Sequence, residues 1–101
     1  MGRVSEGALP SEVIAAAAKL GANIRTARAR RGMTQDELAK ACNITRKTLY
    51  ALEKGAPGTA VGTAFTVLLR LGRLDEVQKL ADATSDPYSA PARETGKTAP
   101  P

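Results

Sequence analysis

Residues 32–55 read GMTQDELAKACNITRKTLYALEKG, and this stretch decides the fold because it contains two short helices joined by a tight turn. Thr34 and Glu37 have the S/T-x-x-E spacing of a capping box, in which the Thr34 hydroxyl accepts a hydrogen bond from the Glu37 amide and the Glu37 side chain reaches back. A helix of about two turns follows. It is expected to end at Asn43, because asparagine tolerates the left-handed backbone conformation.

The second helix of this stretch is expected to begin at Thr45, which is placed to cap it, and to run to Lys54, where Gly55 ends it. Its apolar residues, Leu49 and Leu52, are expected to hold it to the rest of the domain. The remaining surface of the helix carries Arg46, Lys47, Thr48 and Tyr50. Two short helices with a capped, basic second helix are typical of a helix-turn-helix, which we assign to residues 34–54.

The flanking sequence predicts three further helices. Apolar residues at three- and four-residue spacing predict a long helix that is capped by Ser11 and ends at Gly32. Gly21 lies inside it, costs about 1 kcal/mol relative to alanine and is a candidate break point. Two shorter helices are expected at residues 62–71 and 74–83. The folded domain is therefore expected to span residues 11–83, between a flexible lead at 1–10 and a disordered, proline-rich tail at 84–101.

The positive charge of the chain is unevenly placed. The net charge is +5, and the segment from Arg25 to Lys54 carries eight basic and three acidic residues, so this segment holds all of the excess. Such a concentration favours a polyanionic partner. A solvated helical face has the same composition, and composition alone leaves the two interpretations open.

Composition also limits the class of protein. A chain of 101 residues suffices for one small domain, and it contains neither an apolar run long enough to span a membrane nor a secretory leader, so we expect a cytoplasmic protein without membrane contact. With no histidine and the single cysteine Cys42, the usual zinc spacings cannot be built, and we expect no metal and no cofactor. We also expect no enzymatic activity, because no candidate catalytic groups converge.

Several side chains are placed to contact nucleic acid. Gln35 opens the first helix of the helix-turn-helix, where backbone amides and the helix dipole favour a phosphate. Arg46 and Lys47 open the second helix, whose start can enter the major groove and reach guanine O6 and N7; which of the two reads a base is open. Tyr50 either stacks on sugar or a thymine methyl or packs on the body of the domain. The full candidate DNA-binding set is Thr34, Gln35, Thr45, Arg46, Lys47, Thr48, Tyr50 and Lys54.

The sequence resembles the Cro/C1-type (XRE) helix-turn-helix transcriptional regulators. The resemblance covers residues 20–80 and centres on Gly32-Met33-Thr34-Gln35-x-x-Leu38-Ala39 and Ile44-Thr45-x-x-x-Leu49-x-x-Leu52-Glu53-x-Gly55. It implies an all-α, five-helix, lambda-repressor-like domain, a phosphate-binding role for Gln35, base-reading roles for Arg46 and Lys47, and a groove-facing Tyr50. It also implies a structural ion pair between Arg28 and Glu53. Asn43 departs from the glycine that the family usually has in the turn.

A narrower resemblance concerns the HipB-type antitoxins, which pair with HipA-type kinase toxins. It rests on the small residues and leucines of residues 55–63 and 68–72 and on Ser85-Asp86-Pro87. This resemblance implies an alternative function, in which the protein neutralises a kinase toxin and binds DNA for autoregulation.

The two shorter helices at 62–71 and 74–83 carry more aliphatic residues than a domain of this size needs for its core. We therefore expect a homodimer, formed through this stripe or through Val13 and Ile14 at the start of the first helix. A two-fold dimer would place two recognition helices about 34 Å apart, which predicts a palindromic operator in double-stranded DNA.

Overall fold

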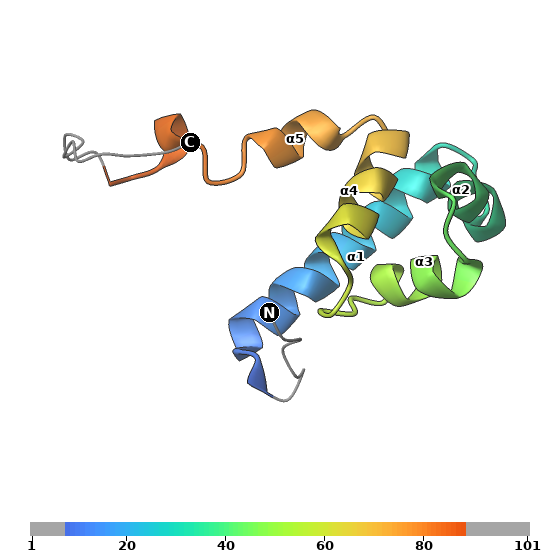
Figure 1. Ribbon diagram of the computed structural model, residues 1–101, viewed down its shortest axis with the longest axis horizontal. Coiled ribbons are helices and arrows are strands. Elements are labelled where there is room, and N and C mark those ends of the chain that lie inside the picture. Colours follow the sequence, from blue (N-terminus) through green and yellow to red (C-terminus); the bar gives the residue numbers. More distant parts are fainter. Residues whose placement is uncertain (1–7, 89–101) are drawn as a thin grey trace.

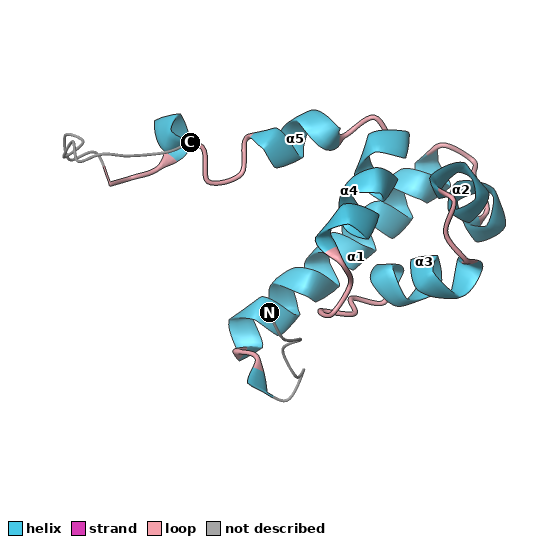
Figure 2. Ribbon diagram, viewed as in Figure 1, coloured by secondary structure: helices cyan, strands magenta, loops and turns pink. Residues whose placement is uncertain are grey.

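The computed structural model describes residues 8–88, which contain α-helices and no strand. The helices are arranged as shown in Figures 1 and 2, and their bounds are α1 (Ser11–Arg30), α2 (Gln35–Cys42), α3 (Arg46–Glu53), α4 (Val61–Arg70) and α5 (Leu74–Gln78). The expected all-α, five-helix architecture is confirmed. Within the described range, no helix combines the length and the apolarity that a membrane crossing needs.

The core is small and aliphatic. Its four most deeply buried side chains, Ile24, Leu38, Leu49 and Val67, come one each from α1, α2, α3 and α4. Smaller residues fill the space between these helices, among them Ala27, Ala39 and Cys42. Because every one of the four helices contributes a fully buried residue, the core fixes α2 and α3 against the rest of the domain.

Helix α1 runs without a break through Gly21. A β-carbon at this position would lie 2.4 Å from the Leu52 carbonyl oxygen and 2.6 Å from that of Glu53. The glycine therefore permits a close approach between α1 and the end of α3. Gly55 serves the same contact, since its φ is +89° and a β-carbon there would meet the backbone of Ala18 at 2.6 Å.

The turn between α2 and α3 forms from local signals. The capping box predicted for Thr34 and Glu37 is present in both directions, at 3.0 and 2.8 Å. Asn43 adopts the left-handed conformation, with φ 57° and ψ 42°, so asparagine in place of glycine leaves the turn intact. The Thr45 hydroxyl caps α3 by accepting from the Thr48 amide at 3.1 Å.

Two predicted features at the ends of the domain were wrong. Ser11 is the first residue of α1 rather than its cap, because the Pro10 carbonyl accepts from the amides of Val13 and Ile14. The predicted helix 74–83 ends at Gln78, and Ala81 has a positive φ of 58°.

Helix α5 ends early because the chain leaves the helical conformation at Ala81, whose φ is positive. The Asp82 carboxylate then accepts from the Thr84 amide and hydroxyl, at the start of a short 3₁₀ turn, Ala83–Ser85. Thr84 and Ser85 lie in this turn, at the start of the segment predicted as a tail. The rest of that prediction, beyond residue 88, and residues 1–7 of the predicted lead lie outside the described residues.

Candidate nucleic-acid interface

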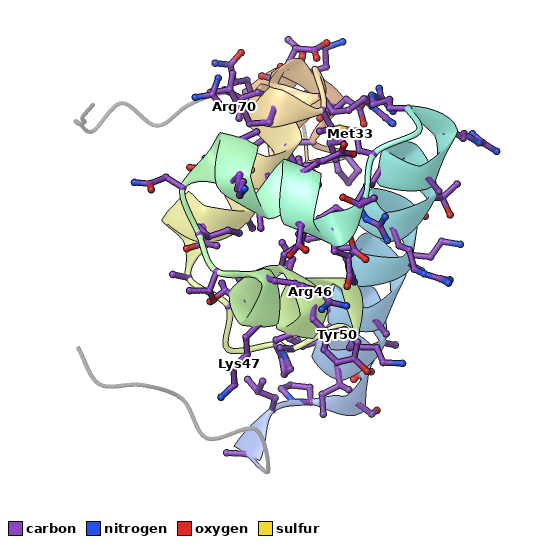
Figure 3. All side chains as sticks on the ribbon, turned by 90° about the vertical axis from the view of Figure 1, so that its right-hand side faces the viewer. Met33, Arg46, Lys47, Tyr50 and Arg70 are labelled. Carbon is purple, nitrogen blue, oxygen red and sulfur yellow. The ribbon has the colours of Figure 1, made fainter. Side chains whose placement is uncertain are left out.

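Helix α3 presents a polar face to solvent. Arg46, Lys47 and Tyr50 project from this helix on one side of the molecule, whereas Arg70 lies beyond α2 at the opposite end (Figure 3). The opposite face of α3 is buried through Leu49 and Leu52. This division fixes the helix in the domain and leaves its basic side free to meet a partner.

Tyr50 is 51% exposed, so its ring does not belong to the core. The Lys54 ammonium lies 5.6 Å from the centre of the ring. A cation over an aromatic face is a favourable contact, and it places Lys54 beside the exposed face of α3.

The ion pair implied for Arg28 and Glu53 is present and almost enclosed. Two nitrogens of the Arg28 guanidinium donate to the Glu53 carboxylate at 2.7 and 3.0 Å, and a third donates to the Met33 carbonyl at 2.8 Å. The side chain of Arg28 is 13% exposed and that of Glu53 is 2% exposed. The hydrogen bonds to Glu53 raise the pKa of Arg28, so its guanidinium stays charged.

Gln35 joins this pair to the recognition helix. Its side-chain amide nitrogen donates to Glu53 at 3.0 Å, and its oxygen accepts from the Arg46 guanidinium at 3.4 Å. Arg46 also lies 4.0 Å from the Asp36 carboxylate, with both side chains about two-thirds exposed. Glu53, Gln35 and Arg46 therefore form a chain of contacts from the interior to the exposed start of α3.

Sequence reasoning missed the protein contacts of two side chains. It assigned Gln35 to phosphate alone, although the structure gives its side chain two protein partners separated from it by 11 and 18 residues. It assigned no specific contact to Arg31, whose guanidinium donates to the Ala27 carbonyl at 2.8 Å and caps the end of α1. Only the four-residue spacing of Ala27 and Arg31 could have indicated the second contact.

The remaining candidate DNA-binding residues lie at the starts of α2 and α3. Thr34 and Thr45 cap α2 and α3, and the Thr45 hydroxyl also donates to that of Thr48 at 2.9 Å. Lys47 is exposed on the first turn of α3. Cys42 lies in the core, where burial raises the pKa of its thiol, which disfavours the reactive thiolate.

Comparison with known proteins identifies the same helix-turn-helix that the structure shows at α2 and α3. A family model described as helix-turn-helix matches residues 24–77, which include α2, the turn and α3. An uncharacterized HTH-type transcriptional regulator of Methanothermobacter thermautotrophicus is 42% identical over 50 residues, covering 50% of this chain and 72% of that protein. No solved structure matches the chain. Because the family model covers more than half of the chain, and its matched region contains the capped α2, the Asn43 turn and the basic α3, the protein belongs to the helix-turn-helix family of XRE-type transcriptional regulators.

Proposed function

We propose that this protein is a sequence-specific repressor that binds double-stranded DNA with α3 in the major groove and acts by occupying its own promoter, without catalysis. The observation that carries the proposal is the exposed basic start of α3, where Arg46 is oriented by Gln35 and the opposite face of the helix is fixed in the core. A rigid helix with a held guanidinium suits the bidentate recognition of guanine.

The start of α2 supports the same placement of α3 in the major groove. The first amides of a helix have no partner within it, and among the described residues the Gln35 and Asp36 amides donate to no backbone acceptor. The Thr34 hydroxyl satisfies the Glu37 amide, which leaves these two amides for a phosphate at the positive end of the helix. Such a contact would set the register of α3 in the groove.

Arg46→Ala is expected to remove about 1–3 kcal/mol of preference for the operator, because each good bidentate base contact contributes that much discrimination. The measurement is a fluorescence-anisotropy titration against DNA from the protein's own upstream region and against a scrambled control, at two salt concentrations. Lys47→Ala, tested in parallel, shows which of the two side chains reads the base.

Arg70→Ala serves as the control, since it removes the same charge from α4, on the far side of the molecule from α3 (Figure 3). Its ratio of operator to scrambled affinity should equal that of the wild type. If Arg46→Ala and Lys47→Ala both kept the wild-type ratio, α3 would not read the operator through its first turn.

We propose that the repressor is a homodimer formed through α4 and α5, bound to a palindromic operator. On α4, Val61, Phe65 and Leu69 are 64%, 37% and 50% exposed. Phe65 and Leu69 border an apolar groove of about 330 Å³ together with Leu74 and Val77 of α5. Figure 1 shows α5 leading away from α1–α4, and the residues that line this groove all belong to α4 and α5. An exposed apolar surface of this kind can meet the same surface of a second copy in a two-fold contact.

Leu69→Glu is expected to convert the dimer to a monomer, since it places a charge in the centre of the proposed contact. Ile14→Glu is the matched substitution on the alternative surface, because Ile14 is similarly exposed at 42%. Sedimentation velocity of both variants at micromolar concentration shows which of the two surfaces forms the dimer. A dimer that survives Leu69→Glu and dissociates with Ile14→Glu would move the contact to the start of α1.

The alternative function is that of an antitoxin that neutralises a HipA-type kinase toxin. Its structural support is two exposed apolar side chains beyond α5, Leu80 and Tyr88, which are 70% and 77% exposed and do not line the proposed dimer groove. Affinity purification of the tagged protein from its native cells, followed by mass spectrometry, tests this alternative. Absence of a HipA-type kinase from the purified complex would remove the support.

A further inference from the structure

A charged groove lies beside the exposed face of α3. It has a volume of about 880 Å³ and is lined by residues of α1, of the start of α2 and of α3. Six of its eleven lining residues carry a charge. Pockets for small organic ligands have similar volumes but are mostly apolar, so this groove is better suited to a charged chain.

Two of the cations in the groove are already paired. Arg28 is bonded to Glu53, and Arg46 lies near Asp36. Once these pairs are set aside, the groove keeps two positive side chains: Arg25 on the α1 wall and Lys54 on the α3 wall. Both are exposed, and neither forms an ion pair with any residue between 8 and 88.

The other arginines of α1 are used differently. Arg28 is nearly enclosed against Glu53, Arg31 donates to the Ala27 carbonyl, and Arg30 does not line this groove. Arg25 is therefore the α1 side chain whose charge is available to the groove. Its sequence position gives no hint of this role, because the helix-turn-helix begins nine residues later, at Thr34.

We infer that Arg25 and Lys54 form a second phosphate-binding position, in which the sugar-phosphate strand flanking the major groove lies in this charged groove. This inference rests on the proposed DNA-binding function and extends it by assigning a contact to α1. The two cations line the groove from different helices, Arg25 from α1 and Lys54 from the end of α3, and the start of α2, which carries the other proposed phosphate contact, also lines it. A charged chain held by all three helices would fix the angle at which α3 enters the DNA.

The test is the salt dependence of DNA binding by the full-length chain. Arg25→Ala is expected to weaken binding to operator and scrambled DNA by the same factor, because a phosphate contact carries no sequence information. It should also make the slope of log K against log salt less steep by about 0.9 for each protomer bound. Between 50 and 200 mM salt, each lost contact should therefore cut the wild-type loss of affinity by about threefold.

Three further variants make the result specific. Lys54→Ala should repeat the effect of Arg25→Ala, Arg25→Lys should restore most of the slope by restoring the charge, and Arg70→Ala should leave the slope at its wild-type value. Circular dichroism establishes that each variant is folded, which is expected because all three side chains are exposed.

The outcomes separate this inference from the proposed function. A wild-type slope for Arg25→Ala, with normal operator binding by the wild type, would overturn the second phosphate position and leave the repressor intact. A loss confined to the operator would also overturn it, since that would make Arg25 a base-reading residue. Failure of the wild-type protein to bind either DNA would overturn the proposed function and this inference together.

Discussion

Replacing Glu53 with alanine is expected to lower the free energy of unfolding by about 3–5 kcal/mol, because the Arg28 guanidinium would remain buried without its partner. The carboxylate is 2% exposed and accepts three hydrogen bonds, two from Arg28 and one from Gln35. Urea denaturation followed by circular dichroism measures the loss as a lower midpoint with an unchanged slope.

The exposed ion pair between Arg73 and Glu76 is the matched control. It has the same chemistry and a similar pattern of hydrogen bonds, but both side chains are about half exposed to solvent. Glu76→Ala should leave the midpoint close to that of the wild type, since exposed pairs are screened by water and salt. Equal losses of stability for Glu53→Ala and Glu76→Ala would show that burial of the Arg28–Glu53 pair does not increase its contribution to stability.

A double variant separates the cost of an unpaired charge from the worth of the pair. Arg28→Met combined with Glu53→Leu removes both charges and keeps most of the side-chain volume. It should be more stable than Glu53→Ala alone, because no buried charge is left unpartnered. A double variant less stable than the single variant would mean that the hydrogen bonds to Met33 and Gln35 contribute more than the ion pair.

The helix-turn-helix could be predicted from sequence because its signals are local. The Thr34–Glu37 box, the Thr45 cap and the Asn43 turn each depend on hydrogen bonds or dihedral angles within four residues. The prediction of the long first helix from apolar residues at three- and four-residue spacing depends on a short period for the same reason. These elements can be predicted without knowing how the rest of the chain folds.

The contacts of Gln35 and Arg25 within the site could not be predicted, because they join residues distant in sequence, and the Arg28–Glu53 pair was implied only by the resemblance to a family. Gln35 meets Glu53 across 18 residues, and Arg25 shares a groove with Lys54 across 29. No periodicity encodes such contacts. The end of α5 was missed for a different reason: aliphatic spacing continues through Leu80 and Ala81, but Ala81 takes a positive φ of 58°, which interrupts the helix.

Gly21→Ala is expected to destabilise the protein by about 3 kcal/mol, the upper end of the cost of overpacking. Alanine is otherwise the better helix former by about 1 kcal/mol, so helix propensity alone predicts the opposite sign. The new β-carbon would lie 2.4 Å from the Leu52 carbonyl oxygen, and that oxygen belongs to a backbone held in place by the buried Leu52 and Glu53 side chains. One of the two helices must therefore move.

Gly62→Ala is the matched control for this prediction, since Gly62 also lies in a helix but a β-carbon there would meet nothing within 4 Å. It should leave the thermal midpoint unchanged or raise it, because only the propensity difference remains. The sign for Gly21→Ala then decides between two roles for the glycine. A higher midpoint would mean that Gly21 merely weakens α1, as its helix propensity alone suggests. A lower midpoint would mean that it is needed for the approach of α1 to α3, and so for the position from which α3 meets the DNA.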